Sequence, residues 1–355
     1  MGKTIVITGG GTAGHVTPNL ALIPLLQQRG FNIHYIGSYN GIEKTLTSEL
    51  PGVQYHGIAS GKLRRYLSLQ NLVDPFRVLK GTAQAKKLLK EIQPDVVFSK
   101  GGFVSVPVAW AAGHLKLPMV LHESDLTPGL ANKLALRCCT RICTTFPETA
   151  KAMGAKAVHT GPPIRETLFH GNAEKGLIFS GLEKGLPILL IMGGSSGARA
   201  INQAVDRNVD TLLTQWQIIH IRGNDGLNTA LEGKRGYAQF VYVQEELPDL
   251  LAAADLLLSR AGANAIWEFA ALHKPMLLIP LPLSASRGDQ LRNAASFVRM
   301  GFAHLLDQDT MTDASLVDAI HQAWISSVSM VEAQKNANTR QGTRALLEEI
   351  LRAAK

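Results

Sequence analysis

The first residues that could do chemistry form a glycine-rich turn near the N-terminus. Gly9, Gly11 and Gly14 follow the apolar run at residues 5–7 and precede a helical pattern. Glycines let the backbone approach a ligand closely, and the N–H groups at a helix N-terminus favour anions. His15 closes the turn, where an imidazole can neutralise a phosphate or accept a proton from a hydroxyl near neutral pH. The turn therefore predicts a binding or catalytic site that includes His15.

This turn has three other interpretations. A nicotinamide-binding fingerprint needs an acidic residue about 20 positions further on, at the end of the second strand. That strand here ends Ile36-Gly37-Ser38, which disfavours a nicotinamide enzyme. A turn that only packs a strand against a helix stays open, because parallel α/β folds contain many such turns. Walker-type phosphate binding is not supported, since the sequence has no Gly-x-x-x-x-Gly-Lys-Ser/Thr motif.

The second half of the sequence contains three polar turns that could hold a nucleotide. They include Gly193, Gly262 and Gln290, and each follows an expected strand. The carboxyl ends of parallel strands meet at one edge of a sheet, where ligands of such folds bind. Glu268, in the helix after Gly262, can accept hydrogen bonds from both hydroxyls of a ribose. The alternative is a solvated carboxylate near a helix start, stabilised by the helix dipole.

Strands and helices alternate in an order that can position these turns. Short β-branched runs are each followed by a glycine-rich turn and a helical pattern, which predicts a parallel α/β architecture. Apolar runs such as residues 188–191 indicate strands that are buried on both faces. We expect six strands in each half, at residues 4–8, 32–37, 95–99, 119–122, 141–145 and 157–160, and at 187–192, 217–222, 238–243, 255–259, 275–280 and 303–306.

The length and a weak internal repeat predict two domains. The 355 residues exceed the roughly 150 of an average domain. The turn at residues 9–15 also has a counterpart at 193–199. We predict a first domain at residues 1–163 and a second at 164–342, with a hinge in the glycine-rich segment that begins at Gly161. A C-terminal helix at 343–355 could pack on either domain.

Most of the net charge of +8 lies in one segment. Residues 62–90 contain eight Lys or Arg and one acid, interleaved with apolar side chains. This composition is typical of a segment that rests on an anionic membrane surface. The alternative is an amphipathic helix that faces the core and solvates its basic face, whereas nucleic acid fits poorly because no recognition-module signature is present. The residues predicted to contact the membrane are Arg64, Arg65, Leu72, Phe76, Leu79 and Lys80.

The sequence disfavours several classes of protein. No apolar run reaches the ~18 residues of a membrane span, and the N-terminus has neither signal-peptide nor transit-peptide features. We therefore expect a cytoplasmic protein. No metal is expected, because Asp307-Gln308-Asp309 follows the last strand among turn formers and is interpreted as a loop. No other cofactor is expected.

Several separated motifs follow one another along the chain. They are Gly9-Gly10-Gly11-Thr12-Ala13-Gly14-His15, Lys100-Gly101-Gly102-Phe103-Val104-Ser105, His122-Glu123, Gly129-Leu130-Ala131-Asn132-Lys133, Gly193-Gly194-Ser195-Ser196-Gly197-Ala198-Arg199, Arg260-Ala261-Gly262-Ala263 through Glu268, and Asp289-Gln290 with Asn293. Together they closely resemble the GT-B nucleotide-sugar glycosyltransferases of peptidoglycan synthesis. The resemblance implies an α/β GT-B fold, in which two Rossmann-like domains face each other across a cleft.

The resemblance also implies a reaction and a location. The reaction is the inverting transfer of N-acetylglucosamine from UDP-GlcNAc to the muramoyl sugar of lipid I, a lipid-linked muramoyl-pentapeptide. It makes lipid II for cell-wall biogenesis, and so serves cell shape and cell division. The location is the cytoplasmic face of the bacterial cell membrane, as a peripheral protein with anionic phospholipid as a partner and no nucleic acid.

The resemblance further implies roles for individual residues. Those for UDP-GlcNAc are Gly194 and Ser195 at the diphosphate, Gln244 near the uracil, Ala263, Asn264, Ala265 and Ile266 under the nucleotide, Glu268 at the ribose, Gln290 at the sugar, and Arg165 from the hinge. Thr12, Ala13 and Gly14 form the acceptor-side loop and are counted with the donor site as well. The acceptor residues are Gly101, Gly102, Asp125 and Asn132. Asp125 stands where the family often has Asn, and Gly161-Pro162-Pro163-Ile164-Arg165 stands where Asn-Pro-Val-Arg is common.

We expect His15 to act as the general base, with Glu123 as the second choice. Two rival functions stay open. A UDP-GlcNAc 2-epimerase of the same architecture would not need the basic apolar segment. A non-catalytic protein that binds a UDP-sugar or a lipid would not need His15. Release of UDP that depends on a lipid I analogue distinguishes the transferase from both rivals.

Overall fold

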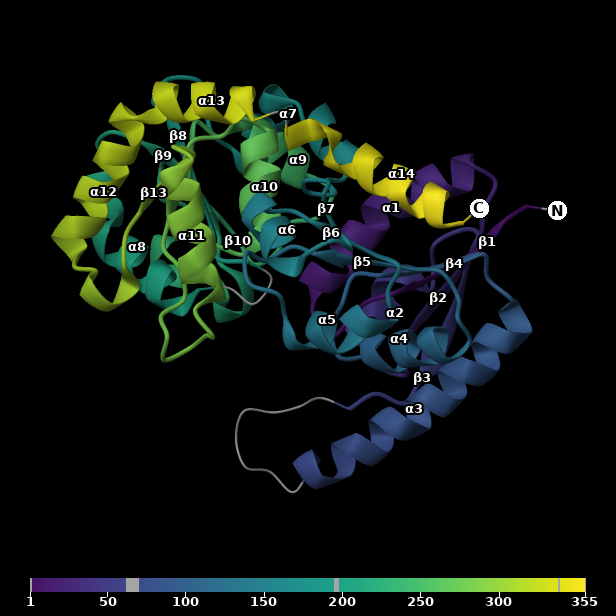
Figure 1. The fold of residues 1–355 in the computed structure, drawn as a ribbon. Coiled ribbons are helices and arrows are strands. Elements are labelled where there is room, and N and C mark those ends of the chain that lie inside the picture. The colour runs from purple at the N-terminus through teal and green to yellow at the C-terminus, as the bar shows by residue number, and fades with distance from the viewer. Residues whose placement is uncertain (1, 62–69, 195–197, 338, 355) are drawn as a thin grey trace. The chain divides into compact units, whose positions relative to one another are not determined.

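The strands of the chain form two parallel sheets, one of seven strands and one of six (Figure 1). The computed structural model describes residues 2–61, 70–194, 198–337 and 339–354, with the backbone alone at residues 13 and 70–73. The chain divides into two units, Met1–Arg165 with Arg340–Lys355 and Glu166–Thr339. The predicted α/β class with two Rossmann-like parallel sheets is confirmed.

The sheet of the first unit has the strand order β3-β2-β1-β4-β5-β6-β7. Thr8, at the end of β1, pairs with Ile36 of β2 on one side and with Ser99 of β4 on the other. From β1 the chain adds strands toward one edge of the sheet, up to β3, and then returns to the other side of β1 and adds β4 to β7 toward the opposite edge. The ends of β1 and β4 therefore border the crevice in which ligands of such sheets bind. The strands are β1 (Thr4–Thr8), β2 (Asn32–Ser38), β3 (Val53–Ile58), β4 (Val96–Ser99), β5 (Met119–Glu123), β6 (Arg141–Thr144) and β7 (Ala157–His159).

Helices cover both faces of this first sheet. On one face, α1 (Thr17–Gln28) and the C-terminal helix α14 (Gly342–Ala353) pack against each other and over Ile5 and Ile7 (Figure 1). On the other face, Val6 lies in a core with residues of α3 and α4. The two-residue period of a strand produces this alternation. The remaining helices of the unit are α2 (Ile42–Thr47), α3 (Gln70–Ile92), α4 (Ser105–His114), α5 (Leu130–Ala135) and α6 (Pro147–Met153).

The second unit repeats the arrangement, with the strand order β10-β9-β8-β11-β12-β13. Leu189 and Ile191 of β8 pack in one core with apolar residues of α8 and α12. The order in which strands are added to the sheet reverses between β8 and β11, and this reversal places the ligand-binding crevice there. The strands are β8 (Ile188–Met192), β9 (Gln217–Ile221), β10 (Tyr237–Phe240), β11 (Leu256–Ser259), β12 (Met276–Leu278) and β13 (Ala303–Leu305). The helices are α7 (Ala173–Ser180), α8 (Arg199–Leu212), α9 (Leu247–Ala253), α10 (Ala263–Ala271), α11 (Asp289–Arg299), α12 (Asp313–Ile325) and α13 (Ser327–Asn336).

The prediction of six strands in the first half was wrong, because β3 adds a seventh. β3 pairs with β2 at the edge of the sheet. Ile58 is its one fully buried residue, and the others are partly or fully exposed. An edge strand needs no continuous apolar run, so the strand signal in the sequence was limited to the short alternation of Val53 and Tyr55 with Gln54 and His56.

Candidate functional site

In the first unit, the loops that follow β1, β4 and β5 meet at the carboxyl edge of the sheet. The Gly10 N–H donates to the Gly101 carbonyl at 3.4 Å, which joins the first two loops. Gly102 has a φ of +85°, and a Cβ there would overlap the Gly10 carbonyl. Lys100 Nζ donates to Ser124 Oγ at 2.7 Å, which joins the third loop. These loops hold the residues predicted for this unit: Thr12, Ala13, Gly14, His15, Gly101, Gly102, Glu123, Asp125 and, at the start of α5, Asn132.

His15 lies at the end of a 3-10 turn, Ala13–His15, just before α1. Its Nδ1 lies 2.9 Å from Thr12 Oγ1, and among the described residues no hydrogen bond reaches Nε2. Burial lowers the pKa of His15 to about 4, with the charge of Lys100 acting in the same direction and that of Glu43 against it. The imidazole is therefore neutral at pH 7. When Nδ1–H donates to the Thr12 hydroxyl, Nε2 carries the lone pair that a general base needs.

Glu123 is buried, and both of its carboxylate oxygens already accept hydrogen bonds. Oε1 accepts from the Asp125 N–H at 3.0 Å, and Oε2 accepts from the Gly129 N–H and from Asn132 Nδ2, each at 2.9 Å. Burial raises the pKa of Glu123, and the charge of Asp125 adds to the effect. Both carboxylate oxygens of Glu123 are thus bonded to the loop after β5 and the start of α5, whereas Nε2 of His15 carries a lone pair. This geometry favours His15 over Glu123 as the base.

Asn132 is buried, and its side-chain amide is incompletely paired among the described residues. Its Nδ2 also donates to the His122 carbonyl at 3.1 Å. Its Oδ1 is buried without a hydrogen-bond partner among the described residues, and it lies where a Cβ on Gly101 would approach to 3.0 Å. A buried oxygen without a donor favours a ligand hydroxyl at this place.

Lys100 is a buried cation for which the sequence analysis had assigned no role. It follows β4 directly and is 3% exposed. Burial lowers the pKa of its ammonium group, while the carboxylates of Glu123 and Asp125 raise it. Its hydrogen bond to Ser124 fixes the loop after β5 to the glycine turn after β4. A lysine between an apolar strand and two glycines was the available signal.

In the second unit, most of the predicted donor residues lie on the loops after β8, β11 and β12 or in the first turns of the helices that follow them. Gly194 is exposed after β8 with a φ of +88°, and Ser195 lies outside the described residues. α10 begins after Gly262, so its first turn directs backbone N–H groups to the carboxyl edge of the sheet, where anions bind. That turn contains the predicted Ala263, Asn264, Ala265 and Ile266, with the half-buried Glu268 one turn later.

Side chains of α11 connect two of these loops. Gln290 Oε1 accepts from the Leu281 N–H at 3.0 Å, which ties α11 to the segment after β12. Asn293 Nδ2 donates to the Ala261 carbonyl at 3.2 Å, which ties the same helix to the loop after β11. The amide nitrogen of Gln290 is the group that could donate to a ligand. Two further predicted donor residues are Gln244, exposed in the loop after β10, and Arg165, half-buried at the end of the first unit's main segment.

Arg260 carries a buried positive charge, and no carboxylate among the described residues pairs with it. It follows β11 and is 7% exposed. Its Nη1 donates to the carbonyls of Ile279 at 2.9 Å and Pro280 at 3.2 Å, and among the described residues its buried Nε has no partner. Burial lowers the pKa of Arg260 to about 10, so the group stays charged at pH 7. An uncompensated cation at this edge favours an anionic ligand.

The first turns of α3 expose apolar side chains beside basic ones. Phe76 is 71% exposed and Leu79 is 61% exposed, and Lys80 beside them is exposed as well. Further along the helix, Ala85 and Leu89 are buried in the core. The core-facing interpretation thus fits the C-terminal half of α3 only, while its N-terminal end projects from the unit (Figure 1). The structure does not describe Arg64, Arg65 or the Leu72 side chain.

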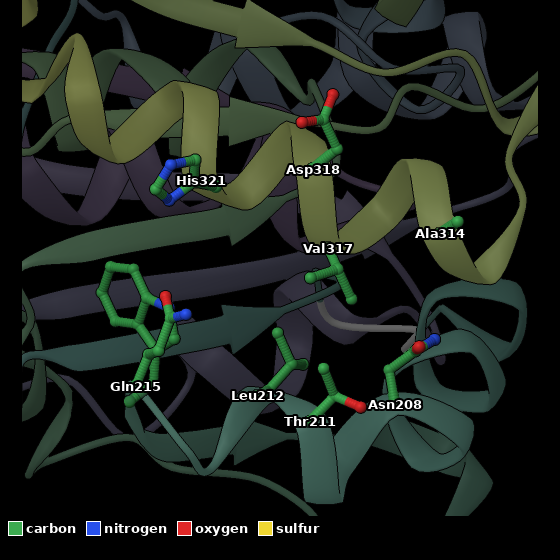
Figure 2. Close-up of a pocket in the computed structure, with 9 residues that line it drawn as sticks. Asn208, Thr211, Leu212, Gln215, Ala314, Val317, Asp318 and His321 are labelled. Atoms are coloured by element: carbon green, nitrogen blue, oxygen red, sulfur yellow. The ribbon is translucent and has the colours of Figure 1, made fainter.

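A groove of about 570 Å³ lies between α8 and α12 (Figure 2). Its lining comes from the C-terminal half of α8, the turn that follows this helix, and the facing side of α12. A helix that follows a parallel strand runs back toward the amino edge of the sheet, so this half of α8 lies away from the glycine turn. The groove is therefore separate from the donor loops. The residues that Figure 2 labels are Asn208, Thr211, Leu212, Gln215, Ala314, Val317, Asp318 and His321.

Comparison with known proteins relates the chain to one family over almost its whole length. The model of the glycosyltransferase family 28 N-terminal domain matches residues 5–144, and that of the C-terminal domain matches residues 188–350. A protein of Lachnoclostridium phytofermentans is 52% identical over 95% of each chain. One of Clostridium botulinum is 51% identical over 99% of this chain and 100% of its own.

Both relatives are named UDP-N-acetylglucosamine-N-acetylmuramyl-(pentapeptide) pyrophosphoryl-undecaprenol N-acetylglucosamine transferase. Among solved structures, that of MurG from Acinetobacter baumannii is 25% identical and matches with a TM-score of 0.76, over 99% of each chain. The sequence and the fold thus relate the chain to the same enzyme.

Proposed function

The chain belongs to glycosyltransferase family 28, and we propose that it transfers N-acetylglucosamine from UDP-GlcNAc to the muramoyl sugar of lipid I. The product is lipid II, for peptidoglycan synthesis. The observation that carries the proposal is that each of the two sheets has a glycine turn at its switch point, which gives one binding edge for each of two substrates. Relatives that match nearly the whole chain bear the name of this transferase.

The second unit is the proposed donor site. The turn at Gly194 and Ser195 would bind the diphosphate, and Glu268 would accept the ribose hydroxyls. The first turn of α10 and its N–H groups support this assignment, because they lie at the edge where nucleotides bind such sheets. Gln290 would donate from its amide nitrogen to the sugar, since its oxygen is already bonded. The further donor residues proposed from the family are Gln244 and Arg165.

The first unit is the proposed acceptor site, and His15 is the proposed base. The muramoyl hydroxyl attacks the anomeric carbon of UDP-GlcNAc from the side opposite UDP, Nε2 of His15 takes the hydroxyl proton, and the bond to UDP breaks. One glycosidic bond forms as one breaks, so the anomeric configuration inverts. The neutral state of His15 at pH 7 supports this role. The surrounding acceptor contacts are proposed for Thr12, Ala13, Gly14, Gly101, Gly102, Asp125 and Asn132.

Departure of UDP leaves negative charge on the diphosphate, and the second unit has cationic and amide groups to stabilise it. The N–H groups of α10 and the buried charge of Arg260 support this. Within the described residues, no group of three or more His, Cys, Asp or Glu could hold a metal ion. The absence of a cofactor stays a prediction.

We place the enzyme at the cytoplasmic face of the cell membrane, with the N-terminal half of α3 on anionic phospholipid. The exposed Phe76 and Leu79 could enter the acyl boundary while the basic side chains contact headgroups. Among the described helices, none has both the length and the apolar character needed to cross a bilayer. Such an attachment would bring the enzyme to its acceptor, because a lipid-linked acceptor lies at the same membrane surface.

The experiment that tests the proposal measures UDP release from UDP-GlcNAc with and without a soluble lipid I analogue. A transferase releases one UDP for each disaccharide product, and release stops without the acceptor. Formation of the 2-epimer of UDP-GlcNAc without the analogue would indicate the epimerase. UDP binding without turnover under either condition would leave a binding protein.

A further inference from the structure

Glu43 is a buried carboxylate beneath the glycine turn, and neither the sequence analysis nor the proposed mechanism uses it. It lies at the start of α2 and is 0% exposed. Oε2 accepts from the Gly11 N–H at 3.0 Å. Oε1 accepts from the Ser38 N–H at 2.9 Å and from Ser38 Oγ at 2.5 Å. The side chain thus connects the end of β2 to the middle of the turn that carries Thr12 and His15.

These hydrogen bonds keep Glu43 ionised. Burial alone would raise the pKa of Glu43, but the bonds from Ser38 and Gly11 outweigh it and hold the pKa below its ordinary value. Three donors also satisfy a buried anion without a counter-ion, which an apolar pocket could not do. At neutral pH the turn therefore rests on a fixed negative charge.

The surrounding glycines leave room for this carboxylate. A Cβ on Gly10 or Gly41 would overlap the Glu43 side chain, and one on Gly37 would meet its Cγ. Three glycines from the β1 loop, the end of β2 and the start of α2 thus face one side chain. The packing fits Glu43 closely, so the turn cannot shift without breaking its bonds.

Other buried side chains hold the rest of the turn from the same side. Tyr35 OH donates to the Gly9 carbonyl at 2.6 Å. Asn19 Nδ2 donates to Tyr35 OH at 2.8 Å and to the His15 carbonyl at 3.3 Å. Both ends of the turn are therefore anchored by neutral groups. Glu43 anchors its middle, at the residue just before Thr12.

We propose that Glu43 is a positioning residue for glycosyl transfer, which holds the Gly11 amide so that Thr12 and His15 present Nε2 to the acceptor hydroxyl. The carboxylate also accepts the hydrogen bond of the Gly11 N–H, which a phosphate would otherwise receive. Its negative charge would in addition repel that phosphate. The turn consequently receives the neutral muramoyl sugar, and the acceptor diphosphate binds elsewhere. This inference rests on the proposed function.

The test compares Glu43→Gln with Glu49→Gln, the same substitution at an exposed glutamate shortly after α2. A glutamine has one oxygen, and Ser38 offers two donors where Gly11 offers one, so the amide oxygen turns to Ser38 and its NH₂ group faces Gly11. Glu43→Gln should lower kcat by about 10- to 100-fold, the size expected for a misplaced catalytic group. The KM values for UDP-GlcNAc and for the acceptor analogue should stay near those of the wild type.

Hydrogen exchange of the Gly11 amide, followed by NMR, measures the same contact without substrate. Exchange should be faster in Glu43→Gln than in the wild type or Glu49→Gln. If Glu43→Gln does not fold, Glu43→Asp provides the test, because it keeps the charge but shortens the reach to Gly11. Its Gly11 amide should also exchange faster, with a lower kcat.

Three results would overturn the proposal: unchanged kcat in the folded Gln variant, an unchanged Gly11 exchange rate, or a lower acceptor KM with unchanged kcat. The last would indicate a phosphate in the turn, freed of a repulsive charge. If the wild type itself transfers no sugar, the proposed function fails, while the exchange measurement still decides whether Glu43 holds the turn.

Discussion

Charged residues in the candidate site bind backbone groups of the loops more than they bind one another. Glu43 accepts from the Gly11 and Ser38 N–H groups, and Glu123 accepts from those of Asp125 and Gly129. Arg260 in the second unit donates to two carbonyls. A full charge forms stronger hydrogen bonds than a neutral group, so each of these side chains fixes a loop that no regular secondary structure supports. Rigid loops are what catalysis requires.

The first prediction concerns His15 and its role as base. His15→Ala should lower kcat by roughly 10²–10⁴, the range for removal of a positioned general base. UDP-GlcNAc affinity should stay nearly the same, because most of the proposed donor residues lie in the other unit. Steady-state kinetics against acceptor concentration provide the measurement. A raised acceptor KM with kcat little changed would instead assign His15 to phosphate binding. If neither constant changes by more than a few-fold, Glu123 becomes the base to test.

The second prediction concerns the pH dependence of kcat. Transfer needs the neutral imidazole, and the pKa of His15 is lowered to about 4. Since protonation sets in only as the pH falls toward that value, kcat should hold level from pH 7 to about 5 and decline below. Initial rates in overlapping buffers, with protein stability checked at each pH, provide the profile. A decline centred near pH 6.5, the ordinary value for histidine, would contradict this assignment.

The third prediction concerns Glu268 as the ribose ligand. Glu268→Ala should weaken UDP binding by about 1.5–3 kcal/mol, the usual size for hydrogen bonds to a charged group. Isothermal titration calorimetry with UDP measures the change. Glu232→Ala, at an exposed glutamate of the same unit, is the control and should bind UDP like the wild type. Unchanged affinity in Glu268→Ala would leave Glu268 as a carboxylate that only stabilises the start of α10.

At the scale of elements, the sequence predicted the strands and turns whose signal is local. A buried strand, a glycine turn and a helix start lie within about 15 consecutive residues, so the turns at Gly9, Gly194 and Gly262 could be predicted from spacing. β3 was missed, because this edge strand lacks a continuous apolar run and its alternation of apolar and polar residues is short. The bond between Glu43 and Gly11 could not be predicted, since it joins residues 32 positions apart through the packing of β2 and α2. Arg260 is part of the motif that begins the loop after β11, but the sequence does not show that its Nε is buried without a partner among the described residues, because this depends on the folded surroundings.

The fourth prediction concerns the basic side chains of α3, with Lys80 in its N-terminal half and Lys87 in its C-terminal half. Replacing Lys80 and Lys87 with Gln should weaken binding to anionic vesicles by about 1 kcal/mol for each charge removed near the surface. Cosedimentation with vesicles of phosphatidylglycerol and phosphatidylcholine measures it. Lys175→Gln with Lys184→Gln removes the same charge from exposed positions of the second unit and serves as the control. UDP affinity should not change in either variant. If neither the α3 substitutions nor added salt weakens vesicle binding, the basic side chains of α3 only face solvent and do not contact the membrane.

At the scale of the whole molecule, the chain enters the second unit after Arg165 and leaves it at Thr339. The C-terminal helix then completes the first unit, where Leu346, Leu347 and Ile350 are buried with Ile5 and Ile7. The sequence left the partner of this helix open, because its amphipathic pattern specifies an apolar face but not the surface that covers it. The first sheet is therefore covered by segments from both ends of the chain.

The last prediction follows from this arrangement and concerns Ile350. Ile350 is fully buried, so Ile350→Ala should lower the free energy of unfolding of the first unit by about 2–5 kcal/mol. Calorimetric unfolding with and without UDP measures this change in stability. UDP binds the second unit and therefore raises the temperature only of the unfolding transition to which that unit contributes. In Ile350→Ala, the unfolding transition whose temperature UDP does not raise is that of the first unit, and it should move to lower temperature. The Kd for UDP should stay the same. Arg344→Ala, at an exposed position of the same helix, should unfold almost like the wild type. A weakened Kd for UDP in Ile350→Ala, with the first transition unmoved, would mean that the C-terminal helix supports the donor unit instead.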